Sequence, residues 1–284
     1  MSSDKKNPAD RLRVGKVDFI NTLPIFYPLE SGAVGHDFLI VDGTPTVLNA
    51  LLAAAELDLG LVSSLEYARR FEEYVLLPDL SISCRSQVCS VLLLSTVPLK
   101  ELAVKEIILT PKSETSIALL KLLFSKRFEV EPRYRVADYH SSGPGWPDGA
   151  SAVLAIGDDA LRLQKSPEVR IALDLGAAWH EWTGCSFVFA VWALRREALA
   201  NRDGLVHQAH TTLLEAREYG LRHLEEIAAT AGQCSWFSKG ECVQYLQTIE
   251  YDLDADKQAG LRLFFDMLHE VGELSQRVPL HFLR

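Results

Sequence analysis

The strongest constraint on the fold is an alternation of strand-like and helix-like segments near the N-terminus. Residues 11–18 alternate apolar and polar side chains, and residues 37–42 and 58–63 are short apolar runs of strand length. A helix-like segment follows each of the three. This order predicts a parallel sheet covered by helices, which is an α/β fold.

Capping residues indicate where these helices begin. Asn21-Thr22 and Thr44 each precede a proline in a first helical turn, and a third helix starts with the pair Ser63-Ser64 at the end of its strand. In parallel sheets, ligands bind at the carboxyl ends of the strands. Because Asn21, Ser63 and Ser64 lie there, position alone makes them candidate site residues.

A second α/β unit follows the first. Residues 81–95 are typical of two strands that meet near Arg85, and residues 106–109 and 152–156 are typical of buried strands. A helix is predicted over residues 116–124, after a polar loop. We therefore expect a second sheet with helices of its own.

A strand rich in phenylalanine and valine is predicted to return the chain to the first unit, and everything after it is predicted to be helical. The result is two lobes around a central cleft: residues 1–94 and 188–284 form a discontinuous first lobe, and residues 95–187 form an inserted second lobe. The two crossings, near Ser90 and Phe187, are expected to act as a hinge. Clefts of this kind are preferred small-molecule sites.

Charge and cysteine usage restrict the partners. With 29 basic and 38 acidic residues the net charge is −9, so nucleic acid and anionic membranes are poor partners, and an anionic small molecule must be held by local donors such as helix N-termini. Five cysteines without CxxC spacing predict neither a disulfide framework nor a zinc site. The polar N-terminus lacks the layout of a secretory signal. We expect a cytoplasmic protein; a homodimer is compatible with these features.

Five stretches of the chain resemble the vitamin K2 (menaquinone) biosynthesis family, whose futalosine-pathway members include the chorismate dehydratases and their sister, 1,4-dihydroxy-6-naphthoate synthase. The stretches are RVGKVDFINTLPIFY (13–27), TPTVLNALLAAAELDLGLVSSLEYA (44–68), TSIALLKLLFSKRF (115–128), IGDDAL (156–161) and WHEWTGCSFVFAVWALR (179–195). The resemblance covers most of residues 13–200, and its first and last stretches favour the dehydratase branch.

The resemblance implies a two-lobe, periplasmic-binding-protein-like (type II) fold and a lyase activity. Chorismate would lose water to give 3-[(1-carboxyvinyl)oxy]benzoate, and no metal or organic cofactor is implied. The chemistry suits neutral donors, because the enzyme has to hold two carboxylates and assist a leaving hydroxyl. The substrate's own enolpyruvyl carboxylate could take the proton.

The resemblance also implies site residues. Asn21 matches the asparagine of the family's first motif and Ser90 matches a cleft serine of the dehydratases, so both are expected to be catalytic. The expected substrate-binding residues are Ser63, Ser64, Arg85, Thr115, Ser116, Gly157 and Asp158. Arg85 opens a segment that departs from the family's usual Asp-Gly-Pro-Val, and its charge could meet a carboxylate there.

Each of these residues also has a structural interpretation. Asn21 and Thr115 could simply cap helices, and a serine in an apolar strand is often a small packed residue. Glu66 and His140 are candidate bases, although a first-turn glutamate usually favours the helix dipole and a lone loop histidine is usually solvated. Trp179, Trp182 and Phe187 could wall the substrate ring, but packing is the more common role for such a set.

Three other functions compete with dehydration of chorismate. A transport solute-binding protein would share the fold but require export. A ligand-sensing domain of a regulator would bring a DNA-binding unit and a basic face. The sister synthase would use a different substrate.

Overall fold

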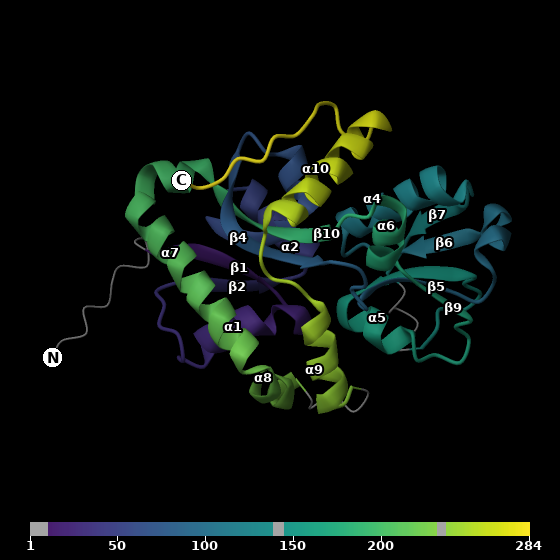
Figure 1. The fold of residues 1–284 in the computed structure, drawn as a ribbon, viewed down its shortest axis with the longest axis horizontal. Helices are drawn as coiled ribbons and strands as arrows, with labels where there is room; N and C mark the ends of the chain where they lie inside the picture. Colours follow the sequence, from purple (N-terminus) through teal and green to yellow (C-terminus); the bar gives the residue numbers. More distant parts are fainter. Residues whose placement is uncertain (1–10, 139–144, 232–236) are drawn as a thin grey trace.

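The computed structural model describes residues 11–138, 145–231 and 237–284 of the chain. Its described part contains two five-stranded sheets, each covered by helices, which lie beside one another (Figure 1). The first sheet has the strand order β2-β1-β3-β10-β4 and the second has the order β7-β6-β8-β5-β9. The predicted α/β architecture with two sheets is therefore present.

The first sheet combines the N-terminal strands with one strand from much later in the chain. Its strands are β1 (Arg13–Val17), β2 (Leu39–Gly43), β3 (Leu59–Ser63), β4 (Tyr74–Cys84) and β10 (Phe187–Arg195). β1 pairs in parallel with β2 and β3, as the alternation predicts, whereas β10 pairs antiparallel with β3 and β4. The sheet is therefore mixed.

Helices follow the parallel strands at the predicted places. They are a 3₁₀ turn, η2 (Ile20–Thr22), and the helices α1 (Leu23–Glu30), α2 (Pro45–Ala53) and α3 (Ser64–Arg69). Thr44 caps α2, since its side chain accepts from the Val47 N–H, and Ser63 caps α3 in the same way. The predicted cap of α1 is wrong: neither Asn21 nor Thr22 caps it through its side chain, and the Thr22 hydroxyl donates to the Val17 and Phe19 carbonyls instead.

The second sheet is built from short strands. They are β5 (Val91–Ser95), β6 (Glu106–Leu109), β7 (Arg133–Val136), β8 (Ala152–Ile156) and β9 (Ile171–Asp174). The helical segments of this unit are η3 (Leu99–Val104), α4 (Glu114–Leu123), η4 (Phe124–Phe128), α5 (Gly157–Leu163) and α6 (Leu175–Thr183). The sequence pattern identified β6, β8 and α4, but not β7, β9 or α6.

The chain crosses between the sheets near Ser90 and Phe187, but the predicted lobe boundary at residue 94 does not coincide with the first crossing. The boundary at residue 94 falls within β5, whose partners β8 and β9 both belong to the second sheet. This fully buried apolar strand needs neighbours on both edges, and the second sheet supplies them. At the return crossing, Phe187 already pairs with Cys84 of the first sheet. The division into two separate lobes remains a prediction.

The C-terminal helices wrap the first sheet and extend toward the second. They are α7 (Arg196–Arg222), α8 (Leu224–Ala231), α9 (Lys239–Thr248) and α10 (Ala255–Glu270). α7 runs along α1, and α9 descends beside α5 (Figure 1), where Lys165 Nζ lies 2.7 Å from a Glu241 carboxylate oxygen. The C-terminal helices therefore contact both units.

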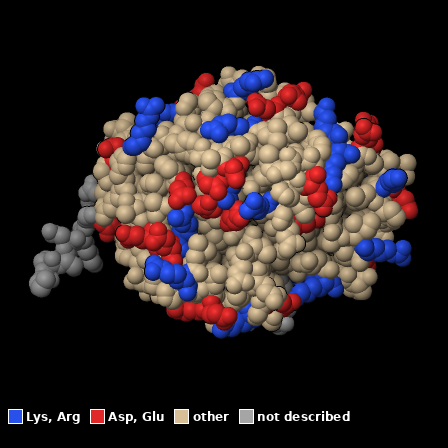
Figure 2. Space-filling model, in the orientation of Figure 1, with Lys and Arg blue, Asp and Glu red and all other residues tan. Residues whose placement is uncertain are grey.

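The surface carries no single-sign region on the face that Figure 2 shows, where Lys and Arg are interspersed with Asp and Glu. Such a mixture gives little attraction for a polyanion on this face. Within the described ranges, no helix is long and apolar enough to cross a membrane.

Candidate functional site

A cavity lies between the two sheets, at the carboxyl ends of β1, β3 and β8. It encloses about 580 Å³ of space free of protein atoms, its mouth included. Both units contribute to its wall, from β4 and β10 of the first sheet as well as from β5 of the second. The lining residues are Val17, Phe19, Asn21, Thr22, Pro45, Leu61, Val62, Ser63, Ile82, Val88, Ser90, Val91, Ser113, Ser116, Ile156, Gly157, Phe189 and Ala190. None of them is charged.

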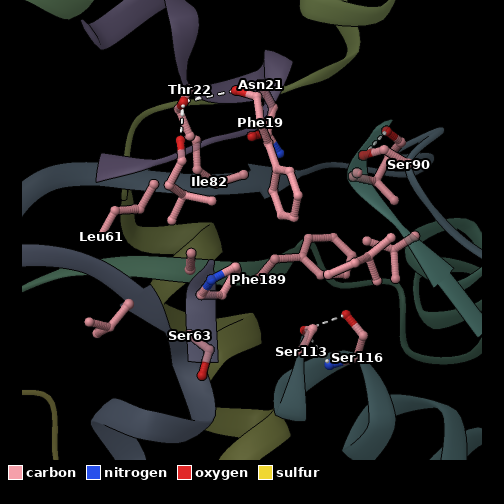
Figure 3. Close-up of a pocket in the computed structure, with 18 residues that line it drawn as sticks. Phe19, Asn21, Thr22, Leu61, Ser63, Ile82, Ser90, Ser113, Ser116 and Phe189 are labelled. Carbon is pink, nitrogen blue, oxygen red and sulfur yellow. Dashed lines mark hydrogen bonds between the residues drawn. The ribbon is translucent and has the colours of Figure 1, made fainter. Parts of the chain in front are cut away.

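Figure 3 shows how the polar groups surround this space. Asn21 and Phe19 lie on one side, the hydrogen-bonded pair Ser113 and Ser116 lies opposite, and Ser90 lies toward the second sheet. Phe189 lies between these groups. The arrangement is an apolar slot with hydrogen-bonding groups at its rim, which suits a small ring that carries polar substituents.

Asn21 belongs to η2, directly after β1. Its backbone carbonyl accepts from the Tyr251 hydroxyl at 2.9 Å, which ties the turn to the C-terminal part of the chain. Asn21 does not cap the following helix. Its side chain lines the cavity and also takes part in hydrogen bonding with Tyr245.

Ser90 lies directly before β5, at the first crossing. It is only 1% exposed, and its hydroxyl oxygen accepts from the Tyr245 hydroxyl at 2.8 Å. Its carbonyl accepts from the Gly157 N–H at 2.7 Å. Ser90 thus connects the segment before β5, the start of α5 and the C-terminal helix α9 at one point of the cavity wall.

Ser63 and Ser64 have different surroundings although they are adjacent. Ser63 lines the cavity, but its hydroxyl oxygen accepts from Asn49 Nδ2 and from the Glu66 N–H, both at 3.2 Å. The fully buried Ser64 hydroxyl donates to the Val188 carbonyl at 2.5 Å and does not line the cavity. Ser64 was predicted to bind substrate, but its hydroxyl forms a hydrogen bond within the protein and lies outside the cavity lining.

The start of α4 forms the opposite rim. Ser113 caps the helix by accepting from the Ser116 N–H at 3.2 Å, and the two hydroxyls are 2.8 Å apart. Thr115 lies between them but points away from the cavity: its hydroxyl oxygen accepts from the Leu65 N–H at 2.9 Å. Ser113 was placed in a loop by the sequence pattern, although its spacing from Ser116 is that of a capping residue.

Gly157 allows the two units to approach closely. Its φ is +55°, and a Cβ atom there would lie 3.0–3.1 Å from the Phe19 ring. The next residue, Asp158, does not line the cavity; its carboxylate accepts from the Ile20 N–H at 3.3 Å. Burial raises the pKa of Asp158 to about 6, with Asp159 and Asp18 adding to the rise and the Ile20 hydrogen bond opposing it.

The remaining predicted residues lie elsewhere. Arg85 is exposed and does not line the cavity, and neither does Glu66, whose carboxylate accepts from the Tyr74 hydroxyl at 3.1 Å. Burial raises the pKa of Glu66, while Tyr74 and Arg70 oppose the rise. His140 lies outside the described residues.

The aromatic set pairs within the core rather than walling the cavity. Trp179 makes edge contacts to Trp182 and to Phe187, with ring centroids 6.0 Å and 5.4 Å apart. The cavity walls are instead Phe19 and Phe189, which the sequence analysis did not single out. Phe19 precedes Asn21 by two residues in the first family-like stretch, and Phe189 lies in the last one. Their position in these stretches is the sequence feature that could have identified them as cavity residues.

The site can bind a ligand through uncharged hydrogen-bond donors. An amide, several hydroxyls and the start of α4 surround a space that has no charged side chain among its described lining residues, so an anion can be bound by oriented dipoles. Of the residues described here, no three His, Cys, Asp or Glu side chains are grouped so that they could hold a metal ion.

Comparisons with known proteins give a consistent result. The family described as menaquinone biosynthesis matches residues 12–270. A chorismate dehydratase of Thermus thermophilus is 35% identical over 270 residues, covering 90% of this chain and 94% of the relative. A chorismate dehydratase of Campylobacter jejuni is 35% identical over 183 residues, covering 62% of this chain and 64% of the relative.

Solved structures identify the fold. A protein of Archaeoglobus fulgidus superposes with a TM-score of 0.74 at 16% identity, covering 94% of this chain and all of that one. The alkanesulfonate-binding protein of Xanthomonas axonopodis pv. citri gives 0.70 at 16% identity and covers 95% and 96% of the two chains. A Candida albicans protein described as having the generic periplasmic binding protein fold gives 0.59 at 14% identity, with coverages of 96% and 97%. The predicted periplasmic-binding-protein-like fold is confirmed.

Proposed function

The chain belongs to the menaquinone biosynthesis family, and from this premise we propose that it is a chorismate dehydratase, a lyase that removes water from chorismate to give 3-[(1-carboxyvinyl)oxy]benzoate. The observation that carries the proposal is the 35% identity to a chorismate dehydratase over 90% of this chain. The predicted function rested on the same motifs that line the cavity, since Asn21 and Phe189 both belong to them.

The polarity of the cavity supports this reaction, because apolar walls are combined with a few uncharged hydrogen-bonding groups. Chorismate carries two carboxylates, an allylic hydroxyl and an adjacent ring C–H. The apolar slot between Phe19 and Phe189 accommodates the ring, while the serines at the start of α4 and the amide of Asn21 offer donors to the polar groups.

The step itself breaks one C–H bond and one C–O bond. The electron pair of the C–H bond becomes part of the aromatic ring, the hydroxyl leaves, and the released proton completes the water molecule. Because none of the described residues that line the cavity is charged, we propose that the substrate's enolpyruvyl carboxylate accepts the proton. Asn21 and Ser90 then act as donors that stabilise charge on the departing oxygen or on a carboxylate.

The alternatives have less support. The alkanesulfonate-binding protein shares the fold with this chain at 16% identity, whereas the Thermus thermophilus chorismate dehydratase is 35% identical to it over 270 residues. The sister synthase belongs to the same family, and the product decides between the two. Free thiols at Cys84, Cys89 and Cys185 support a reducing, cytoplasmic setting.

The test is incubation of the purified chain with chorismate, with the product identified by mass and ultraviolet spectrum. We expect an aromatic product lighter than chorismate by one water, formed without added metal and unaffected by a chelator. Activity that disappears with a chelator and returns with zinc would contradict the cofactor-free mechanism. Chorismate recovered unchanged would favour the sister synthase or a binding protein.

A further inference from the structure

The C-terminal helices reach the cavity through one tyrosine. Tyr245 of α9 donates its hydroxyl hydrogen to Ser90 Oγ at 2.8 Å, across 155 residues of sequence. Both partners are buried, with Tyr245 4% exposed and Ser90 1% exposed. Tyr245 does not line the cavity, so any effect it has on a ligand passes through the residues that do.

The hydrogen bond to Tyr245 determines which way the Ser90 hydroxyl can donate. A serine hydroxyl has one hydrogen and two lone pairs, and Tyr245 occupies one lone pair. The Ser90 hydroxyl can then donate its own hydrogen either to the Val88 carbonyl, which is 3.4 Å away, or to an acceptor in the cavity. Since O–H···O bonds are normally 2.5–3.0 Å long, the contact to Val88 is weak. An acceptor in the cavity therefore competes successfully for this hydrogen.

We infer that Tyr245 is a positioning residue for the proposed dehydration, which holds Ser90 as a hydrogen-bond donor toward the substrate. The inference rests on the proposed function for its kinetic consequence, but the contact itself does not depend on it.

The Tyr245 hydroxyl is favoured in its protonated form, as a hydrogen-bond donor has to be. Burial raises the pKa of Tyr245 well above its ordinary value, while hydrogen bonding with Ser90 and Asn21 opposes the rise. The nearby Asp158 further favours the neutral form, in which the hydroxyl keeps the hydrogen that it donates to Ser90.

A double-mutant cycle in chorismate turnover tests the kinetic part. Tyr245→Phe removes the donor and keeps the ring, and we expect kcat to fall about 10-fold or more with KM within about threefold of wild type. Because Tyr245 acts through Ser90, the double variant Ser90→Ala/Tyr245→Phe should be no slower than Ser90→Ala alone. Multiplicative losses, or a normal kcat in Tyr245→Phe, would overturn the inference.

Tyr67→Phe is the matched control. The Tyr67 hydroxyl is also buried and donates at 3.0 Å, but to the Pro279 carbonyl, away from the cavity. It should lower the melting temperature by a similar amount and leave kcat unchanged. A loss of kcat in Tyr67→Phe equal to that in Tyr245→Phe would show that both losses are merely structural, which also overturns the inference.

A measurement without substrate separates the inference from the proposed function. In protein labelled with ¹³C at the tyrosine ζ carbon, Ser90→Ala should shift the NMR signal of Tyr245 and leave that of Tyr67 in place. An unmoved Tyr245 signal would disprove the contact even if Tyr245→Phe fails to fold. A wild-type protein that does not convert chorismate would contradict the proposed function, while the NMR result still decides the link between Tyr245 and Ser90.

Discussion

At the scale of single residues, the polar side chains of the site differ in how many hydrogen bonds they make to the rest of the protein. Asn21 is held through its carbonyl and through side-chain hydrogen bonding with Tyr245, and Ser90 is held through the same tyrosine and its own carbonyl. Ser64 and Thr115 were also predicted to bind substrate, but their hydroxyls form hydrogen bonds with the protein backbone instead. A sequence pattern locates polar residues at strand ends, but the direction of each hydroxyl depends on partners that are distant in the chain.

Asn21→Asp tests the residue on which the proposed chemistry depends most. The change keeps the size but removes the amide donor and places a negative charge beside a dianionic substrate. Loss of one preorganised donor costs on the order of 10²–10³ in rate, and the loss should fall on kcat more than on KM. The fold should persist, because the backbone contact to Tyr251 is unaffected.

Steady-state kinetics and circular dichroism check this result. The exposed Asn201→Asp is the matched control, which introduces the same charge away from the cavity and should turn over normally. Near-normal kcat in Asn21→Asp would remove Asn21 from the catalytic set.

Asp158→Asn tests the buried carboxyl at the contact between the two units. The folded pKa is about 6 and the ordinary value is 3.8, so between these values the folded protein retains a proton that the unfolded chain has lost. Stability therefore falls as the pH rises through this window, and the penalty is complete above about pH 6. Asparagine keeps an oxygen that can accept from the Ile20 N–H and removes the penalty.

Urea unfolding at several pH values measures the difference. We expect Asp158→Asn to be more stable than wild type by about 1–3 kcal/mol at pH 7.5, from a shift of roughly two pKa units, and nearly equal to it at pH 4. A difference that does not change with pH would contradict the assignment of the raised pKa to Asp158.

At the scale of elements, the first βαβαβ segment was predictable because its periodicity, caps and prolines agree. β7 and β9 were not, since both are largely exposed or half-buried and lack the buried apolar run that marks the equally short β6. The cavity-facing strand ends could be predicted from the parallel order alone. The contact of Tyr245 could not, because nothing local in a C-terminal helix indicates a partner 155 residues away.

The packing of α7 on α1 depends on a glycine. A Cβ atom at Gly220 would lie 1.8 Å from the Pro24 carbonyl oxygen and 2.5 Å from its carbon, and backbone atoms cannot rotate out of the way. Gly220→Ala should therefore destabilise the protein by about 2–3 kcal/mol, as overpacking does.

Gly204→Ala in the same helix is the control. A Cβ atom at Gly204 would meet nothing within 4 Å, so this change should leave stability equal or raise it by up to about 1 kcal/mol. Thermal unfolding of the two variants separates the packing effect from helix propensity. Equal melting temperatures would show that α7 is not held against α1 at Pro24.

At the scale of the whole molecule, the two units meet across the cavity through a small set of contacts. The Leu65 N–H donates to Thr115, the Ile20 N–H donates to Asp158, and the Thr46 hydroxyl donates to the Pro111 carbonyl at 2.8 Å. Each joins an element that follows a strand of the first sheet to one in the second. A hinge at the two chain crossings, which would let these contacts open and close together, remains a prediction.

Gly157→Ala tests a further contact between the two units, that of Gly157 with the Phe19 ring. The added methyl group would press on the Phe19 ring, and the φ of +55° is strained for alanine. We expect kcat/KM for chorismate to fall at least about 10-fold, with a loss of stability of about 1–2 kcal/mol. Measuring both kcat/KM and the free energy of unfolding in urea separates the two causes. A misplaced Phe19 lowers turnover in protein that is still folded, whereas general unfolding lowers both. Unchanged turnover would show that contact of Phe19 with Gly157 is not needed in the active form.

The central claim is that the cavity between the two sheets converts chorismate rather than merely holding it. The most direct measurement is the number of molecules of 3-[(1-carboxyvinyl)oxy]benzoate formed per protein chain when chorismate is in large excess. We predict many turnovers per chain, with each product molecule accounted for by one chorismate consumed. Chorismate that binds but is recovered unchanged would contradict the claim and identify the cavity as a binding site only.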